Sequence, residues 1–283
     1  MRLLRLLALF LFPALGLAQA PPTTTLAGIA HVAIRVSDLA RARDFYHQLG
    51  FEQAFTWSKD GKTTQAFLKV NDRQFIELYP QSDPSQSLGF MNVCFESWDL
   101  QALHRAYLSR ELTPTAVSRD DAGNLLFTMV GPEQQDIEFT QYMPGSLQTK
   151  DKGQHLGANP ISKQIAGVSL RTEDPVAART FYELKLGFHE SLHPLEPGLI
   201  PLLLPGPSGQ LIEITPGAYQ IFFAVPSLWH ASSQLKALHL SVQKQGSMLI
   251  VQDPDGNRIV FATIEPETGR KLLQMPKIPW ITK

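Results

Sequence analysis

The sequence has a single cysteine, Cys94, among its 283 residues. One thiol cannot form an intramolecular disulfide, so no covalent cross-link supports the fold. Stability must come from a packed core, and a hydrophobic content of 43% is sufficient to build one. The composition therefore excludes a disulfide-rich scaffold and a disordered chain, and the length allows one large domain or two of ordinary size.

An excess of charge of either sign is also missing. The chain has 25 Lys and Arg residues against 26 Asp and Glu residues, which gives a formal net charge of -1. Without a basic surface, binding to nucleic acid or to an anionic membrane is not expected. We therefore expect the partner to be a small molecule.

The N-terminal hydrophobic run is too short to span a membrane. The uncharged segment Leu6–Leu17 falls below the roughly 20 residues that a spanning helix needs. It follows two arginines and precedes Ala-Gln-Ala, a pattern typical of a secretory signal peptide that is cleaved after Ala20. The sequence therefore predicts a signal peptide over residues 1–20 and a periplasmic or extracellular protein without membrane contact after cleavage.

What the sequence does contain is an internal repeat. The stretch IAHVAIRVSDLARARDFYHQLGF, from Ile29, aligns with IAGVSLRTEDPVAARTFYELKLGF, from Ile165, with one extra residue before the final Leu-Gly-Phe. In both copies an alternating strand leads to an aspartate at a turn, then to a helix with a Phe-Tyr pair, and the helix stops at glycine. Three strand-like runs follow the first helix, so the predicted repeat unit is βαβββ.

Four such modules account for most of the chain. The second begins with GFMNVCFES and ends near Tyr142, and the third begins at Ile165. The fourth is abbreviated, with KALHLSV as its first strand, almost no room for a helix, and MLIVQDPDGNRIVFATI at its end. The polar segment between the second and third modules, PGSLQTKDKGQHLGANPI, predicts a linker.

The predicted fold class is α+β, with four βαβββ modules arranged as two paired-module domains. The predicted segments are the signal peptide 1–20, a first domain 27–143, a linker 144–160, a second, degenerate domain 161–265 and a C-terminal tail 266–283.

Alternation along the predicted strands separates a core face from an open face. The aliphatic face of the first strand consists of Ala30, Val32, Ile34 and Val36. That face must pack on the helix, which leaves His31 on the open face together with Ile29. The same alternation places Glu77, Asn92 and Glu138 on the open faces of their strands. Each of these polar residues occupies an equivalent place in the first or last strand of a module.

Each polar side chain also has a structural interpretation. A lone histidine on a strand is often simply hydrogen-bonded, and Glu77 and Glu138 fit the usual pattern of polar residues on the solvent side of an antiparallel sheet. Cys94 shares the open face with Asn92 and is most simply a small buried hydrophobic residue. The equivalence between modules argues against a coincidental arrangement of the carboxylates.

The tandem βαβββ plan, the opening IAHVAIRVSDLARARDFYHQLGF and the closing DPDGNRIVF resemble the vicinal oxygen chelate superfamily. This group includes glyoxalase I, extradiol dioxygenases and bleomycin resistance proteins. The resemblance implies that His31, Glu77 and Glu138 hold a divalent ion such as Zn, Mn, Ni or Fe(II), with open positions for two oxygens of a substrate. Asn92 stands where the superfamily more often has histidine. Because an amide oxygen is a weak ligand, the site has three protein ligands or holds no metal.

The second pair of modules has fewer candidate ligands. Its equivalent positions are predicted to be Gly167, Glu213, His239 and Val260. Only two of these can bind a metal, so the second pair is expected to be structural or to cover the substrate. If the first module paired with the fourth instead of the second, the ligand set would become His31, Glu77 and His239.

Three functions remain open at this point. The leading one is a glyoxalase-like lyase or isomerase, in which a metal takes two substrate oxygens and Glu77 or Glu138 acts as the catalytic base. The second is an Fe(II) extradiol dioxygenase, although dioxygenases of the superfamily keep their ligands in the second pair. The third is a secreted, metal-free ligand-binding protein. In every case the chain is expected to be a monomer or a homodimer.

Overall fold

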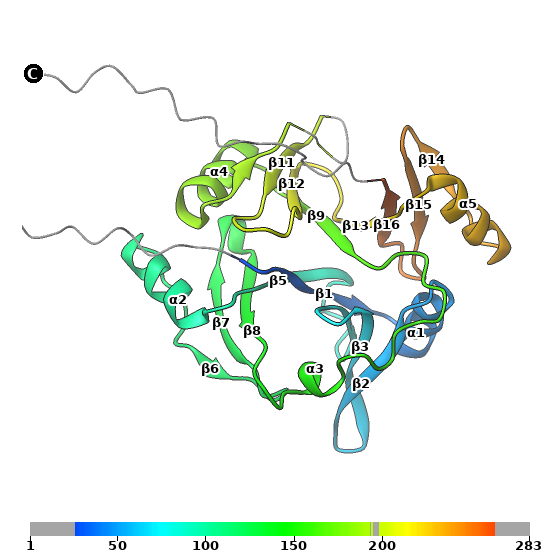
Figure 1. Cartoon of the computed structure of the whole chain (residues 1–283), viewed down its shortest axis with the longest axis horizontal. Helices are drawn as coiled ribbons and strands as arrows, with labels where there is room; N and C mark the ends of the chain where they lie inside the picture. The colour runs from blue at the N-terminus through cyan, green and yellow to red at the C-terminus, as the bar shows by residue number, and fades with distance from the viewer. Residues whose placement is uncertain (1–25, 193, 195–197, 264–283) are drawn as a thin grey trace, which may run out of the picture.

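The computed structural model describes residues 26–192, 194 and 198–263. Within them the chain forms two eight-stranded sheets with a few helices, which is the predicted α+β fold (Figure 1). The predicted signal peptide and the predicted C-terminal tail lie outside the described residues. No helix among the described residues is both long enough and apolar enough to cross a membrane.

The first two modules form one sheet, which we call the first sheet. Its strand order is β2-β3-β4-β1-β5-β8-β7-β6, so the modules meet where β1 pairs with β5 in antiparallel orientation. Within each module the first strand pairs in parallel with the last, β1 with β4 and β5 with β8. The strands are β1 (Gly28–Val36), β2 (Glu52–Lys59), β3 (Lys62–Asn71), β4 (Gln74–Pro80), β5 (Gly89–Glu96), β6 (Ser118–Arg119), β7 (Leu125–Val130) and β8 (Asp136–Gln141).

The third and fourth modules repeat this plan in the second sheet. Its order is β10-β11-β12-β9-β13-β16-β15-β14, with β9 and β13 antiparallel at the centre. The strands are β9 (Ile165–Arg171), β10 (His189–Glu190), β11 (Ile200–Leu203), β12 (Leu211–Thr215), β13 (Gln220–Ala224), β14 (Gln243–Gln245), β15 (Met248–Gln252) and β16 (Arg258–Ala262). The predicted paired-module architecture is confirmed.

The helices begin where the sequence provides N-caps. The Asp38 carboxylate accepts a hydrogen bond from the backbone at the start of α1 (Leu39–Gln48), and Asp174 does the same for α4 (Pro175–Thr180). A π-helical segment, η2 (Phe181–Leu186), continues α4 and accommodates the extra residue of the third module. The other helices are α2 (Leu100–Ser109), η1 (Pro132–Gln134), α3 (Leu147–Lys150) and α5 (Leu228–Ala237).

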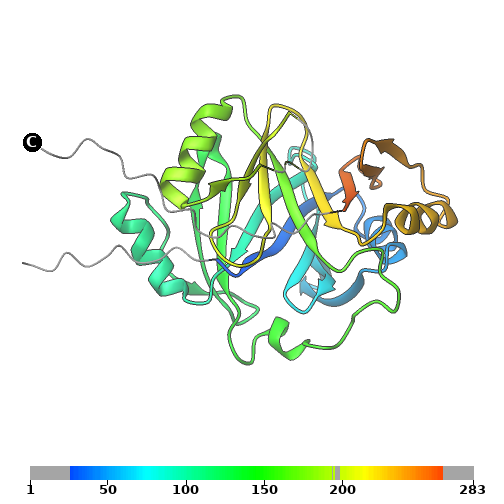
Figure 2. The ribbon, with the colours of Figure 1, turned by 45° about the horizontal axis from the view of Figure 1, so that its top comes forward.

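The helix-facing sides of the two sheets share one hydrophobic core. Ile34 of the first sheet and Leu170 of the second belong to the same buried cluster. Phe51 stacks on Phe223 across the two halves, with ring centroids 5.0 Å apart. The helices lie at the two ends of this core, α1 beside α5 and α2 beside α4 (Figures 1 and 2). The opposite faces of the sheets are therefore free to form two separate sites.

The fourth module differs from the prediction in its first half. Its first strand is β13, and the full helix α5 follows, so the expectation of almost no helix was wrong. The Ser227 side chain caps this helix by accepting from the backbone N–H of His230. His239, predicted on a strand, instead lies just after the helix in a left-handed turn with φ of 56°. Its strand β14 has three residues, one more than the corresponding strands β6 and β10 of the second and third modules.

The segment between the two sheets, predicted as a linker over residues 144–160, packs on the first sheet. It contains α3, and the side chain of Asp151 just after that helix is buried. The ammonium group of Lys69 in β3 lies 2.7 Å from Asp151 Oδ2 and donates to the carbonyl oxygen of Gln154 at 2.8 Å. Lys69 is opposite Phe75, and Phe75 is opposite His31, so the segment covers the face that carries His31.

Candidate functional site

The central strands of the first sheet bring the predicted site residues to one face. His31 in β1 lies opposite Cys94 in β5, and Cys94 lies opposite Glu138 in β8. Residues opposite one another on neighbouring strands point to the same side of a sheet. Glu77 in β4 is in register with Ala33, two residues beyond His31, and therefore shares that side.

Ile29 is an exception to the predicted alternation. It was expected on the face of His31, but it belongs to the hydrophobic core together with Val32 and Ile34. The cause is a register shift between Ile29 and His31 where β1 pairs with β5, which is a β-bulge or a similar irregularity. The irregularity lets β1 enter the core with an apolar residue and still present His31 on the open face.

His31 contacts both predicted carboxylates at once. Its Nδ1 atom lies 3.1 Å from Glu77 Oε1, and its Nε2 atom lies 3.1 Å from Glu138 Oε2. Burial alone would lower the pKa of His31, but the carboxylate of Glu77, with Cys94 and Glu138, raises it well above the ordinary value. Without a bound cation the imidazole is therefore protonated and donates one N–H to each carboxylate.

Glu77 is held firmly on the Nδ1 side. Its Oε2 atom accepts hydrogen bonds from Gln65 Nε2 at 2.7 Å and from the hydroxyl of Tyr79 at 3.1 Å. Burial raises the pKa of Glu77, and the neighbouring His31 offsets only part of this effect. Burial, followed by the charge of Glu77, raises the pKa of Tyr79 as well, so the phenol stays a hydrogen-bond donor. These contacts keep the Glu77 carboxylate in place against the imidazole.

Glu138 is the more accessible of the two carboxylates. Its side chain is 23% exposed, against 6% for Glu77. The other Glu138 oxygen, Oε1, accepts from Asn92 Nδ2 at 3.0 Å. Asn92 Oδ1 is buried and has no hydrogen-bond partner among the described residues. A buried carbonyl oxygen without a partner is costly, so the Asn92 amide has an oxygen available for a further group.

Cys94 belongs to this cluster although it was not predicted as a ligand. Its Sγ atom, a ring nitrogen of His31 and an oxygen of Glu138 all lie within 4.8 Å of one another. Burial raises the pKa of Cys94 to about 12, so without a cation the thiol is neutral. The alternation that placed Asn92 on the open face places Cys94 there too, and this was the available signal.

The second sheet lacks most of these donor atoms at the same strand positions. Its register makes Gly167 equivalent to His31, Glu213 to Glu77 and Val260 to Glu138. The equivalent of Asn92 is Gln220 and not His239, because β13 is the first strand of the fourth module. The alternative set of His31, Glu77 and His239 does not form, since the first module pairs with the second.

Residues 28–139 match the family described as the Glyoxalase/Bleomycin resistance protein/Dioxygenase superfamily. No curated protein matches the chain. Among solved structures, the Mn(II)-bound glyoxalase from Novosphingobium aromaticivorans is similar, with a TM-score of 0.63, 15% identity and coverage of 84% of this chain and 82% of that chain.

Two dioxygenase structures are similar to the same degree. The extradiol ring-cleaving dioxygenase from B. fuscum has a TM-score of 0.65 and 16% identity, covering 87% of this chain and 74% of that chain. The 2,3-dioxygenase LapB from Pseudomonas sp. KL28 has a TM-score of 0.64 and 15% identity, covering 86% and 93%. At these identities the structures show a shared fold. The match over residues 28–139 places the first pair of modules in the glyoxalase/bleomycin resistance protein/dioxygenase superfamily, also called vicinal oxygen chelate proteins.

Proposed function

We propose that the chain is a metal-dependent lyase or isomerase of the glyoxalase type, with its active site on the open face of the first sheet. The substrate is a small molecule that presents two neighbouring oxygen atoms. The observation that carries this proposal is the cluster of His31, Cys94 and Glu138, whose ligand atoms lie within 4.8 Å of one another, with Asn92 bonded to Glu138 beside it. The similar fold of a Mn(II)-bound glyoxalase supports it.

The donor set fits a divalent cation. His31 through Nε2, Glu138, and Asn92 through Oδ1 would hold the ion, and Cys94 is near enough to contribute its sulfur. Imidazole and oxygen donors suit Zn, Mn, Ni or Fe(II). Glu77 would keep its contact with Nδ1, and a carboxylate in that position orients a metal-binding histidine. The predicted role of Glu77 as a direct ligand stays a prediction, which a pair of variants can test.

The two carboxylates have different environments, which favours different roles. A divalent cation at this site would stabilise negative charge that develops on a substrate oxygen. Glu138 is the carboxylate that solvent reaches, so it is the better candidate for taking a proton from the substrate and returning it. Glu77 is buried and bonded to Gln65 and Tyr79, which suits a positioning role.

An extradiol dioxygenase is the second candidate, because similar dioxygenase structures span most of this chain. In the second sheet, Gly167 and Val260 occupy the positions of His31 and Glu138 and provide no ligands. Ring-cleaving chemistry would therefore also have to use the first sheet.

Metal analysis of the purified protein tests the proposal. We expect a stoichiometric divalent cation in the wild-type chain, its loss in His31→Ala and its retention in His47→Ala, since the His47 side chain is 63% exposed. Wild-type protein that binds none of the candidate metals on reconstitution would make the chain a metal-free binding protein. In the metal-loaded protein, oxygen uptake with catechol would favour the dioxygenase, and isomerisation of a hemithioacetal without oxygen uptake would favour the lyase or isomerase.

We also propose that the protein acts in the periplasm or outside the cell. The support is the sequence pattern of residues 1–20. Mass spectrometry of the protein from its native source should find an N-terminus at Pro21. Recovery of a chain that retains Met1 would contradict export by cleavage.

A further inference from the structure

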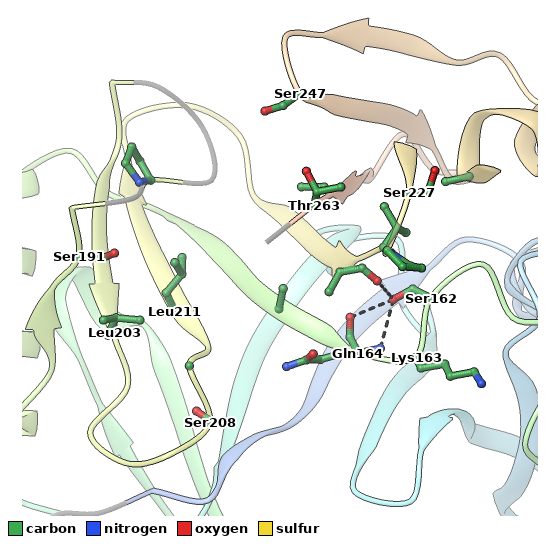
Figure 3. A pocket seen from close by; sticks show the side chains of 18 of the residues that line it. Ser162, Lys163, Gln164, Ser191, Leu203, Ser208, Leu211, Ser227, Ser247 and Thr263 are labelled. Carbon is green, nitrogen blue, oxygen red and sulfur yellow. Dashed lines mark hydrogen bonds between the residues drawn. The ribbon is translucent and has the colours of Figure 1, made fainter. Parts of the chain in front are cut away.

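A cavity of about 1540 Å³ opens on the second half of the molecule. Figure 3 shows it between the chain that enters β9, the hairpin end of β11 and β12, and the start of α5. Its volume exceeds the roughly 300–1,000 Å³ of an ordinary small-molecule pocket. Its lining residues belong to the second half and to residues 160–164 before β9, so it is separate from the cluster around His31.

The second sheet has apolar residues at the strand positions where the first sheet has its ionisable ones. One row across the first sheet contains Lys69, Phe75, His31, Cys94 and Glu138. The same row across the second sheet contains Leu203, Leu211, Gly167, Phe222 and Val260. Every charged or metal-binding side chain of the first row is replaced by an apolar residue or by glycine. Of this row, Leu203 and Leu211 line the cavity, and Phe222 and Val260 pack against alanines that line it.

Small side chains line part of the cavity. Ala166, Ala224 and Ala262 line it and pack with the buried side chains of Phe222 and Val260 in one apolar cluster. Leu203 and Leu211 line its side (Figure 3). In the first sheet, the residue equivalent to Leu203 is Lys69, which binds the segment after α3 across the open face. A leucine cannot form the ion pair and hydrogen bonds that hold this segment. The space above the second sheet is therefore left open, whereas in the first sheet the segment occupies it.

The rim of the cavity is polar but carries little charge. Several residues with hydroxyl groups line the cavity, namely Ser208, Ser227, Ser247 and Thr263 and the buried Ser191 (Figure 3). Hydroxyl groups both donate and accept hydrogen bonds, so they suit neutral oxygen groups. The described residues that line the cavity include no aspartate or glutamate. Lys163 extends away from these hydroxyl groups in Figure 3, and the lining histidines, His189 and His230, are exposed.

We propose that this cavity is a second binding site, which takes a neutral, mainly apolar small molecule with hydroxyl or carbonyl groups and binds it without metal. The apolar body of the ligand contacts the three alanines and the two leucines, and its oxygens face the hydroxyl groups of the lining. This site does not depend on the metal-dependent function proposed for the first sheet.

Fluorescence titration with N-phenyl-1-naphthylamine, a neutral apolar probe, tests the proposal on the full-length mature protein. We expect saturable binding at one site per chain. Leu203→Trp should fill the cavity and weaken binding by roughly tenfold or more. Leu184→Trp is the matched control, because Leu184 is 72% exposed on η2 and does not line the cavity, and it should bind like the wild type. His31→Ala should also bind the probe like the wild type.

Circular dichroism checks that Leu203→Trp is folded. If Leu203→Trp does not fold, Ser208→Trp replaces it in the test. Ser208 lies in the loop between β11 and β12, is partly exposed and lines the cavity. The proposal is overturned if the probe does not saturate, if the folded cavity-filling variant binds it like the wild type, or if His31→Ala loses it. Tighter binding of the anionic probe 1-anilinonaphthalene-8-sulfonate than of the neutral probe would show that the ligand class is wrong.

Discussion

The hydroxyl group of Tyr46 donates a hydrogen bond to the carboxylate of Asp253 over 3.1 Å, which joins the first helix of the chain to the loop before its last strand. The third module makes the equivalent contact with the second, since the hydroxyl of Tyr182 donates to Gln135 Oε1 at 3.2 Å. Both tyrosines come from the repeated Phe-Tyr pair. The two halves are thus bound by two contacts of the same kind, one at each end of the shared core.

Replacing Tyr46 by phenylalanine should destabilise the protein by about 1–2 kcal/mol. The reason is that Tyr46 and Asp253 are both buried, so the carboxylate loses a donor that water does not readily replace. Asp253 keeps its contacts with Asn257, which limits the loss. Urea unfolding measures the effect. Tyr182→Phe is the matched control and should cost less, because its acceptor Gln135 is only partly buried and neutral.

If Tyr46→Phe unfolds at the same urea concentration as the wild type, the contact contributes nothing to the union of the halves. If Tyr182→Phe costs more than Tyr46→Phe, the buried carboxylate is not the reason for the difference.

The internal repeat made the first three modules and the site face predictable. Alternation in β1 separates His31 from aliphatic neighbours without any tertiary information, and the same holds for Glu77 and Glu138. Local pattern alone could not locate the register shift that accompanies the burial of Ile29 in the core, because that shift arises where β1 pairs with β5. It also could not show that Glu77 and Glu138 contact different nitrogens of His31.

The error in the fourth module has a physical cause. The stretch KALHLSV alternates like a strand, but its first residues end a helix whose apolar positions, Leu228, Ala231 and Leu235, are spaced by three and four. Ser227 before them is a typical N-cap and was a usable signal. The packing of Asp151 against Lys69 joins residues 82 apart in sequence, so only the folded chain reveals it.

Replacing Lys69 by methionine should destabilise the protein by about 3–5 kcal/mol. The ammonium group is fully buried and contacts Asp151 Oδ2 at 2.7 Å and Asp72 Oδ1 at 2.9 Å, so its removal leaves the buried Asp151 carboxylate with His155 as its remaining ion-pair partner. The double variant with Asp151→Asn should recover part of the loss, because it removes that charge. Chemical denaturation of both variants measures this. A double variant less stable than Lys69→Met would contradict the argument.

Glu138→Gln should lower the metal affinity more than Glu77→Gln does. Glu138 faces the same ring nitrogen of His31 that the proposed ion needs, whereas Glu77 faces the other nitrogen. Loss of a group that only orients a ligand typically weakens metal binding by roughly 10- to 100-fold. Titration with Mn(II) or Zn(II) gives both affinities. An equal loss in the two variants would show that Glu77 binds the ion directly, as the superfamily resemblance implies.

The stability of the protein should decrease between about pH 4.5 and 7 because of Glu96. Burial raises the pKa of Glu96 from 4.5 to about 7, despite its ion pair with Arg73. Below about pH 4.5 the Glu96 carboxyl is protonated in both the folded and the unfolded chain. The folded state then does not bear the cost of a buried charge, and its stability is at its highest with respect to this group. As the pH rises towards 7, the unfolded chain ionises first, which favours unfolding by up to about 3 kcal/mol in total.

The difference in unfolding free energy between Glu96→Gln and the wild type isolates this contribution, because the other titrating groups cancel. Glu96→Gln should gain stability relative to the wild type as the pH rises from about 4.5 to 7, and the difference should level off above 7. Glu173→Gln is the control, since the Glu173 side chain is exposed, and its difference from the wild type should stay flat. A Glu96→Gln variant that loses relative stability over this range would show that the ion pair with Arg73 outweighs the effect of burial.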